Sequence, residues 1–384
     1  MNVHAPPAAG PVRTLQIDAA EADPAAVLLA GLGAGPFALL VVFASPRCDF
    51  AALTAGVRAE FPTTPIALCT TAGEIGPAGY SDGTIVALAF DRADFAAEVV
   101  RIGPLHDADC AVPDAPIAAT RAALAARFPT LRREFAFVLI DGLSGREDAL
   151  MAKLGAALGH IPIFGGSAGD GDRYGHALLG HDGEVLEDSA LLCLVRTRYE
   201  MKVFTLDHFV PTGRRLVVTD ADPETRTVHT INAEPAAEEY ARHLGLSRAD
   251  LGPHVFALHP LVVRIGDRHH VRSIQCMDET GALRFFSAID EGLVLTLSEA
   301  GDLVSHLSAQ LDALSAPLPP SAILACDCIF RRLEAEQYQA GSRVSDLLHR
   351  AKVVGFSTYG EQIGSLHVNQ TMTGVALYPP GTVL

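Results

Sequence analysis

The 384-residue chain contains no tryptophan, only 6% aromatic residues and few lysines. Packing must therefore rest mainly on alanine, valine and leucine. The chain is nevertheless 49% hydrophobic, which is too apolar for a disordered protein. At this length we expect two or three domains rather than one core.

Positive charge is also scarce. Lysine and arginine together number 29 against 45 acidic residues, so the formal net charge is -16. A chain this acidic repels phosphate backbones and anionic membrane surfaces. We see no arginine-rich stripe that would offset this charge, so we expect no binding to nucleic acid or to membranes.

Targeting and membrane-spanning segments are missing from the sequence. The first residues, MNVHAPPAAGPVR, place proline and histidine where a signal peptide has a basic start and an apolar run. The longest apolar stretch, Pro36–Ala44, is much shorter than the about 20 residues of a membrane span. We predict a cytoplasmic protein, with a buried strand at Pro36–Ala44.

The seven cysteines are an odd set without a CxxC pair, which argues against structural disulfides. They are Cys48, Cys69, Cys110, Cys193, Cys276, Cys326 and Cys328. Most are expected to be small buried residues. GxxxxGK[ST], GxGxxG and HExxH motifs are absent too, so nothing supports nucleotide chemistry.

An internal repeat is the main feature that the sequence does contain. Each copy has an apolar strand, a helix, a second strand, a glycine-containing turn and a closing strand. Two copies lie in residues 36–105 and 135–199, and a third begins at the strand Ala322–Cys326. Their turns are Cys69–Ile75, Gly165–Asp170 and Gly355–Glu361.

The repeat predicts an α/β (α+β) fold in which duplicated strand–helix–strand–turn–strand units form layered mixed sheets. We divide the chain into an N-terminal extension (1–35), a duplicated domain (36–199) and a C-terminal domain of mixed sheet and helices (200–384). Short alternating strands and one amphipathic helix at Ala300–Leu314 are expected before the third copy.

The turns are candidate ligand sites because ligands gather where loops leave the carboxyl ends of strands. Their polar residues are Glu74, Ser167, Asp170, Ser357 and Glu361. Small residues let a ligand approach the backbone, and each acid could receive an amine or simply cap neighbouring backbone groups. Both interpretations of the acids remain open at this stage.

One turn also resembles an enzyme motif. Gly165–Gly169 matches the G-x-S-x-G elbow of serine hydrolases, with Ser167 as nucleophile, but that elbow requires a helix directly afterwards. The following residues, Asp170–Gly175, are a poor helix start. The other two turns lack the serine at this place, so repetition explains the match better and we expect no enzyme.

The three turns resemble the hallmark segments of FIST proteins, and Asn232–Ala236 and Val271–Ile274 are similar to segments of the FIST C-terminal domain. The resemblance covers nearly the whole chain, with a FIST N-terminal domain followed by a FIST C-terminal domain. It implies an intracellular input domain for signal transduction that binds a small ligand and is often encoded near sensor kinases.

Three segments further resemble the NosP-type subset, which binds haem, senses nitric oxide and modulates a partner histidine kinase. They are His208–Thr212, Ala257–Arg264 and Cys326–Glu334. Haem iron needs an axial imidazole, for which His259 and His208 are the candidates, and its propionates pair with arginine, here Arg264 or Arg272. Cys328 or the absence of haem are the alternatives.

The function that follows is a small-ligand sensor, with haem and nitric oxide as its sharpest form and a separate histidine kinase as its output partner. Nitric oxide would weaken the iron–histidine bond and shift a two-state equilibrium. The alternatives are a sensor of an organic ligand such as an amino acid, held by the turns of Glu74, Asp170 and Glu361, and a hydrolase centred on Ser167. A homodimer is left open.

Overall fold

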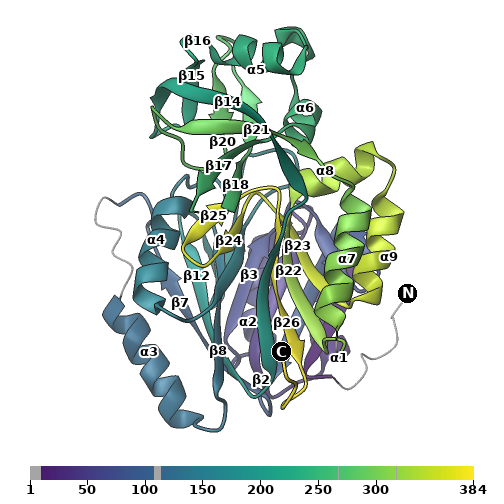
Figure 1. The fold of residues 1–384 in the computed structure, drawn as a ribbon. Helices are drawn as coiled ribbons and strands as arrows, with labels where there is room; N and C mark the ends of the chain where they lie inside the picture. Colours follow the sequence, from purple (N-terminus) through teal and green to yellow (C-terminus); the bar gives the residue numbers. More distant parts are fainter. Residues whose placement is uncertain (1–9, 108–113, 267, 317) are drawn as a thin grey trace.

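The computed structural model describes residues 10–107, 114–266, 268–316 and 318–384, and Cys110 lies outside this part (Figure 1). The strands of the described chain form four sheets. The helices are α1 (Pro24–Leu32), α2 (Phe50–Glu60), α3 (Asp114–Arg127), α4 (Glu147–Leu158), α5 (Ala236–Leu244), the 3₁₀ helix η1 (Arg248–Asp250), α6 (Pro253–Leu258), α7 (Leu303–Ser315), α8 (Ile329–Gln337) and α9 (Gly341–Arg350).

Three of the sheets are variations of one pattern. The first has the order β1 (Val12–Asp18), β6 (Thr84–Asp91), β2 (Phe37–Ala44), β3 (Ile66–Thr70), β10 (Leu179–His181) and β11 (Glu184–Leu186). The second has the order β25 (Leu366–Val368), β24 (Glu361–Ile363), β9 (Ile163–Ser167), β8 (Arg133–Ile140), β12 (Ala190–Thr197) and β7 (Phe95–Ile102). The third has the order β13 (Glu200–Leu206), β26 (Met372–Tyr378), β22 (Ala322–Cys328), β23 (Val353–Thr358), β4 (Glu74–Gly76) and β5 (Gly79–Ser81).

Each of these sheets is built on a parallel pair of strands and a closing strand antiparallel to the first of them. The parallel pairs are β2/β3, β8/β9 and β22/β23, and the closing strands are β6, β12 and β26. The repeat predicted from the sequence is thereby confirmed, including its third copy. The mixed-sheet α/β (α+β) fold class is confirmed with it.

The units are interlocked because each one gives its small hairpin to another unit's sheet. Hairpin β4–β5 of the first unit pairs with β23 of the third, and hairpin β24–β25 of the third pairs with β9 of the second. Hairpin β10–β11 of the second unit pairs with β3 of the first, which closes the cycle. The result is an approximate threefold arrangement in which no unit completes its own sheet.

Two parts of the predicted segmentation need correction. Residues 12–32, treated above as an N-terminal extension, form β1 and α1, and β1 pairs with β6 along its whole length. Strand β7, assigned above to the first copy, pairs with β12 of the second sheet. Each unit is therefore preceded in the chain by a strand that lies at the edge of its sheet (β1, β7 or β13). The similarity of the three turns gives no information about these strands.

The fourth sheet, with its helices α5 and α6, is inserted between β13 and α7 and lies at one end of the molecule in Figure 1. Its order is β18 (Arg268–Arg272), β17 (Leu261–Ile265), β21 (Val294–Ala300), β14 (Phe209–Asp222), β15 (Thr227–Ile231), β20 (Leu283–Phe285) and β19 (Ile274–Met277), with β16 (Glu234–Pro235) beside β15. One hydrophobic cluster joins it to the repeats, since Phe256 and Phe286 of the insert pack with Phe330 and Tyr359.

The remaining expectations about composition can be placed on this fold. All residues of β2 are buried, as the apolar run predicted. The cysteines of the described chain are unpaired, and Cys69, Cys193, Cys326 and Cys328 are buried, whereas Cys48 is half-buried and Cys276 is exposed. No helix in the described residues is long and apolar enough to span a membrane.

Candidate functional site

The three glycine-containing turns meet and bond to one another, forming what we call the turn ring (residues 70–74, 167–171 and 357–361). The backbone hydrogen bonds that close it are Ala72 N to Ser357 O (2.9 Å), Ser357 N to Gly73 O (2.7 Å), Ser167 N to Gly360 O (2.8 Å) and Gly171 N to Thr71 O (3.1 Å). The small residues of the turns permit this close approach of three backbones. The turn ring thus holds the three units together.

The glutamates of the ring are bonded to their own turns. Glu361 is completely buried; its Oε1 accepts a hydrogen bond from Thr358, and its Oε2 accepts from Thr371 N (3.1 Å) and Oγ1 (2.9 Å). Glu74 has the same arrangement, with Thr71 at Oε1 and Thr84 N and Oγ1 at Oε2. These hydrogen bonds are those that the capping interpretation predicts, and a ligand role of the two glutamates stays a prediction.

Glu361 should make stability depend on pH. Burial raises the pKa of Glu361 from its ordinary 4.5 to about 8, so the folded chain keeps a proton that the unfolded chain loses. Stability contributed by this group is therefore lost as pH rises from about 4.5 to about 8. We expect Glu361→Gln to flatten the fall of the unfolding free energy between these pH values, measured by urea unfolding. The exposed Glu60→Gln should not change this slope, and an unchanged slope in Glu361→Gln would contradict the assignment.

The other turn residues are also buried within the fold. The Oδ2 of Asp170 accepts hydrogen bonds from Gly175 N and His176 N, both at 3.0 Å, and its Oδ1 accepts from Tyr359. Ser167 Oγ accepts from Gln362 Nε2 at 2.9 Å. The element that follows β9 is strand β10 rather than a helix, so Ser167 does not stand in a hydrolase elbow.

His208 lies in a buried network that uses both of its ring nitrogens. Its Nε2 donates to the Glu334 carboxylate at 2.9 Å, and its Nδ1 is 3.1 Å from Arg331 Nη1. Arg331 in turn donates from Nε to Asp327 at 2.7 Å. An iron at His208 would have to displace one of these partners, so the residue does not fit an axial ligand in this structure.

His259 has a different environment. It ends α6, its ring is half-buried, and its Nδ1 has no hydrogen-bond partner in the described chain. Burial lowers the pKa of His259, which favours the neutral imidazole that binds metals. Arg264, the first propionate candidate, is exposed on β17, and its Nε donates to Gly266 O.

Arg272 stands apart from the other buried arginines. The buried arginines of the described chain are Arg226, Arg272, Arg331 and Arg332. The other three face carboxylates. Arg226 faces Glu147 and Asp148, Arg331 faces Asp327, and Arg332 faces Asp82 and Glu336. Arg272 has no carboxylate partner in the described chain, only long contacts from Nη1 to Val271 O (3.5 Å) and His367 O (3.4 Å). Burial lowers the pKa of Arg272, and the charge of the nearby Asp148 opposes this shift although it forms no salt bridge with Arg272 in the described chain.

An unpaired buried cation costs stability, so Arg272→Met should not destabilise the fold. We expect the unfolding free energy of this variant to equal or exceed that of the native chain by about 1 kcal/mol, in chemical denaturation. A loss of several kcal/mol would show instead that Arg272 is held by a compensating interaction.

Other unpartnered polar atoms belong to residues that neighbour Arg272 in the chain or lie on the segments bonded to it, and we call these residues the polar cluster. Its members are Arg272, Ser273, Gln362, His367, Asn369 and Gln370, each with one buried side-chain nitrogen or oxygen that has no partner in the described chain. They are half of all such atoms there. Hydrogen bonds connect the segments, since Arg272 reaches His367 O, Gln362 Nε2 is 3.2 Å from His367 Nδ1, and Ser287 donates to Asn369.

The cluster lies directly on the turn ring. A side chain at Gly360 would place its Cβ 2.2 Å from His367 Cε1 and 3.0 Å from Asn369 Nδ2. Glycine is therefore required for the turn ring to contact the polar cluster. Burial lowers the pKa of His367 and outweighs the opposite effect of Glu147 and Asp148, while Arg226 and Arg272 lower it further. The imidazole is therefore neutral and offers either a donor or an acceptor.

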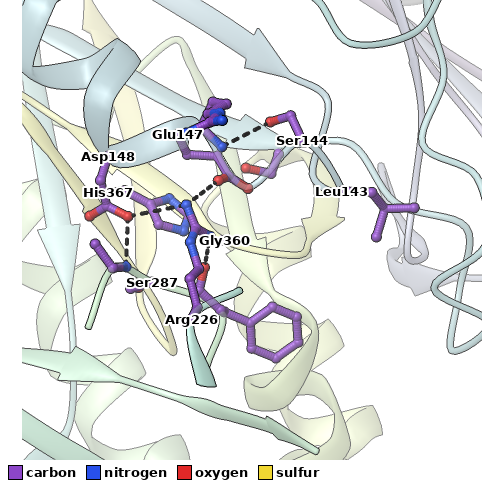
Figure 2. Close-up of polar contacts among 12 residues, drawn as sticks. Leu143, Ser144, Glu147, Asp148, Arg226, Ser287, Gly360 and His367 are labelled. Atoms are coloured by element: carbon purple, nitrogen blue, oxygen red, sulfur yellow. Dashed lines mark hydrogen bonds and ion pairs between the residues drawn. The ribbon is translucent and has the colours of Figure 1, made fainter. Parts of the chain in front are cut away.

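A salt bridge closes the cluster on the side of α4. Figure 2 shows the Arg226 guanidinium turned toward the first residues of this helix, in the group that also holds His367. Arg226 Nη2 is 2.7 Å from Glu147 Oε2 and 3.4 Å from Asp148 Oδ2, and Ala288 N donates to Asp148 at 2.8 Å. All of these bonds join the inserted sheet to the second unit.

The sequence reasoning identified Arg272 but not the rest of this site. The polar residues His367 and Asn369–Thr371 of the last copy are a signal in the sequence, since they directly precede a completely buried strand. The residues that face these side chains could not be predicted, because they depend on where the inserted sheet docks on the repeats.

The fold and the cluster together define a class of protein: three interlocked repeat units carrying an inserted sheet, with partly unsatisfied polar groups buried where the two meet. The chain belongs to the FIST family, because the FIST N domain matches residues 38–234 and the FIST C domain matches residues 236–364. FIST domains are associated with small-ligand sensing and signal transduction.

A curated relative adds no function to this family assignment. The chain is 24% identical over 278 residues to an uncharacterized protein of Methanocaldococcus jannaschii. The match covers 62% of this chain and 53% of the relative, so it spans about half of the relative's length.

Proposed function

We propose that this chain is an input protein of signal transduction that binds a small polar ligand at the polar cluster, between the inserted sheet and the repeats. The observation that carries the proposal is that half of the buried, unpartnered side-chain atoms of the described chain belong to these few connected segments. A buried polar atom without a partner costs about 1–3 kcal/mol, so a ligand that satisfies several of them gains affinity.

Ligand binding at this place would change how the inserted sheet sits on the repeats. The cluster takes Arg272 and Ser273 from the insert and His367, Asn369 and Gln370 from the third unit. A ligand that bonds to both sides favours the docked arrangement and shifts the equilibrium toward it. An amino acid or a similar small metabolite has the size and polarity for this role.

The test is a thermal-shift screen of small polar metabolites, amino acids included, with the native chain and Asn369→Leu. We expect at least one compound to raise the melting temperature of the native chain and to lose this effect in Asn369→Leu. The matched control Gln337→Leu changes an exposed amide and should respond like the native chain. A compound that raises the melting temperatures of the native chain and of Asn369→Leu equally would show that it binds outside the polar cluster.

Haem is a second candidate ligand, supported by the unpartnered Nδ1 of His259. Bound haem would supply an iron that takes nitric oxide. We expect reconstitution with haem to give a Soret band that is lost or shifted in His259→Ala and retained in His208→Ala, read by absorption spectroscopy. A native chain without a Soret band after reconstitution would end this hypothesis.

The output of either sensor would pass through a separate partner, for which we propose a histidine kinase. The input protein would act on it as a monomer or a homodimer. Autophosphorylation of the kinase in the presence of the chain, with and without ligand, measures this coupling; kinase activity that ignores the ligand would refute it.

A further inference from the structure

One loop of the second unit has no counterpart in the other two units. In the first and third units the glutamate of the turn, Glu74 or Glu361, is also the first residue of the exchanged hairpin. In the second unit residues 171–178, which we call the extra loop, lie between the turn and strand β10. Since β10 pairs with β3, the extra loop lies where the chain crosses from the second unit to the sheet of the first.

Hydrogen bonds hold the extra loop in one conformation. Asp170 Oδ2 accepts from the backbone N–H groups of Gly175 and His176, both at 3.0 Å. The hydroxyl oxygen of Tyr359 accepts from Asp170 N at 3.1 Å and from Tyr174 N at 3.3 Å. The rings of Tyr174 and Tyr359 also stack, with centroids 4.6 Å apart. A loop fixed in this way presents its side chains to a ligand without a further cost of ordering.

A pocket opens between the extra loop and the first unit, with a volume of ≈ 370 Å³. Arg173 and His176 line it from the extra loop. Its apolar lining includes Phe50 at the start of α2, Leu178 before β10, and Val185 on β11. Val185 is 38% exposed, although it is a large aliphatic side chain. A ligand with an apolar body would remove this surface from water.

Arg173 supplies an incompletely paired positive charge at this pocket. Its Nε donates to Asp170 O at 3.1 Å and is 3.9 Å from Asp170 Oδ2, and its Nη1 and Nη2 have no hydrogen-bond partner in the described chain. The exchanged hairpin of the first unit differs, since Asp82 follows it and pairs there with Arg332 of the third unit. The two terminal nitrogens of Arg173 are therefore open to an anionic ligand.

The carboxylates that line the pocket are engaged within the fold. Asp170 is 5% exposed and accepts from two backbone N–H groups and from Tyr359. Asp49 caps α2 by accepting from Ala52 N at 3.0 Å. An ammonium group would have to compete with these bonds, whereas a carboxylate finds the terminal nitrogens of Arg173 open. The same two negative charges disfavour a second charge on the ligand, so a monoanion is favoured over a dianion.

We propose that this pocket is a second binding site, which takes a small organic monocarboxylate with an apolar body. The carboxylate pairs with the guanidinium of Arg173, and the apolar body lies against Phe50 and Val185. The cation and the apolar side chains line the same cavity, so one small molecule can reach both. No residue of the polar cluster lines this cavity, and the inference therefore goes beyond the proposed function.

The experiment is calorimetric titration of the native chain with benzoate and with three compounds that share its ring: benzyl alcohol, benzylammonium and phenyl phosphate. Benzoate should bind at least tenfold more tightly than each of them, because they carry no charge, the opposite charge or a second negative charge. Acetate, which has the head group without the ring, should also bind at least tenfold more weakly. Absence of benzoate binding, equal binding of benzyl alcohol, or tighter binding of phenyl phosphate would each overturn the proposal.

Variants separate the head group from the apolar body. Arg173→Met changes a side chain that is 61% exposed, so we expect it to fold and to weaken benzoate at least tenfold. Arg173→Lys should restore only part of this loss, because a point charge replaces the planar fork. Val185→Ser should weaken benzoate about threefold through lost apolar contact. The matched control Arg127→Met, at an arginine that is 58% exposed on α3, should bind like the native chain. Unchanged benzoate binding in Arg173→Met would contradict the assignment.

Failure of this inference differs from failure of the proposed function. Benzoate binding should be unchanged in Asn369→Leu, and a ligand of the polar cluster should act equally on the native chain and on Arg173→Met. Benzoate binding that is lost in Asn369→Leu but kept in Arg173→Met would place the carboxylate at the polar cluster and overturn the second site alone. A metabolite that depends on Asn369, with no binding of benzoate, would likewise keep the sensor and remove the second site.

Discussion

Gly355→Ala is expected to prevent the chain from folding. A Cβ at this position would lie 1.7 Å from the Ala325 carbonyl oxygen, which belongs to the backbone of the neighbouring strand. Gly355 and Ala325 are paired in the parallel register of β22 and β23, and Ile75 of the exchanged hairpin pairs with Gly355 on the other side. No side-chain rotation relieves such a clash, so the strands would have to separate.

The expected loss exceeds about 5 kcal/mol, because separating β23 from β22 also releases the hairpin that locks the first unit to the third. Soluble expression and far-ultraviolet circular dichroism measure it. Gly165→Ala should act alike, since a Cβ there would lie 2.1 Å from the Val138 carbonyl oxygen in the second unit. A Gly355→Ala chain with native dichroism and melting temperature would contradict the packing described here.

Gly341→Ala is the matched control. Gly341 begins α9, and a Cβ there would meet nothing within 4 Å. Alanine is the better helix former and restricts the unfolded chain, so this variant should be unchanged or more stable by up to about 1 kcal/mol. The same substitution thus has opposite expected effects at two glycines of one repeat unit.

The repeated elements were predictable because their signals are local. The buried strand expected at Pro36–Ala44 is β2, and the helix expected at Ala300–Leu314 is α7 (Leu303–Ser315). Apolar periodicity and Asp-Gly turns act over a few residues and need no tertiary information.

The hairpin exchange could not be predicted, because a hairpin sequence states that two strands pair but not which sheet receives them. Glu74 pairs with Phe356, far away in the chain, and this choice is made by the close packing of the turn ring. The sequence therefore left two roles open for the acids of the turns, ligand binding and capping, and their hydrogen bonds in the structure are those of capping.

The candidate site was predictable only in part, for the same reason. The sequence indicated Arg272 as a donor to an anionic propionate. In the structure its Nε has no hydrogen-bond partner in the described chain, and its role toward a ligand stays a prediction. His367 and Asn369 belong to the third copy and face Arg272 only because the inserted sheet docks there. Such a site, assembled from two distant segments, has no sequence motif of its own.

Arg331→Met is expected to cost about 3–5 kcal/mol of unfolding free energy, in contrast to Arg272→Met. Both side chains are buried, but Arg331 donates to Asp327 at 2.7 Å and lies 3.1 Å from His208 Nδ1. Its removal leaves the completely buried Asp327 with Tyr80 as its remaining side-chain donor in the described chain. The desolvated carboxylate then destabilises the fold.

Chemical denaturation of Arg331→Met and of the double variant Arg331→Met/Asp327→Leu tests this interpretation. Removing both charges should recover part of the loss, because the uncompensated carboxylate disappears with its partner. Arg173→Met, at an arginine whose side chain is 61% exposed, should change stability by less than about 1 kcal/mol. Equal costs for Arg331→Met and Arg272→Met would remove the distinction between a paired and an unpaired buried arginine.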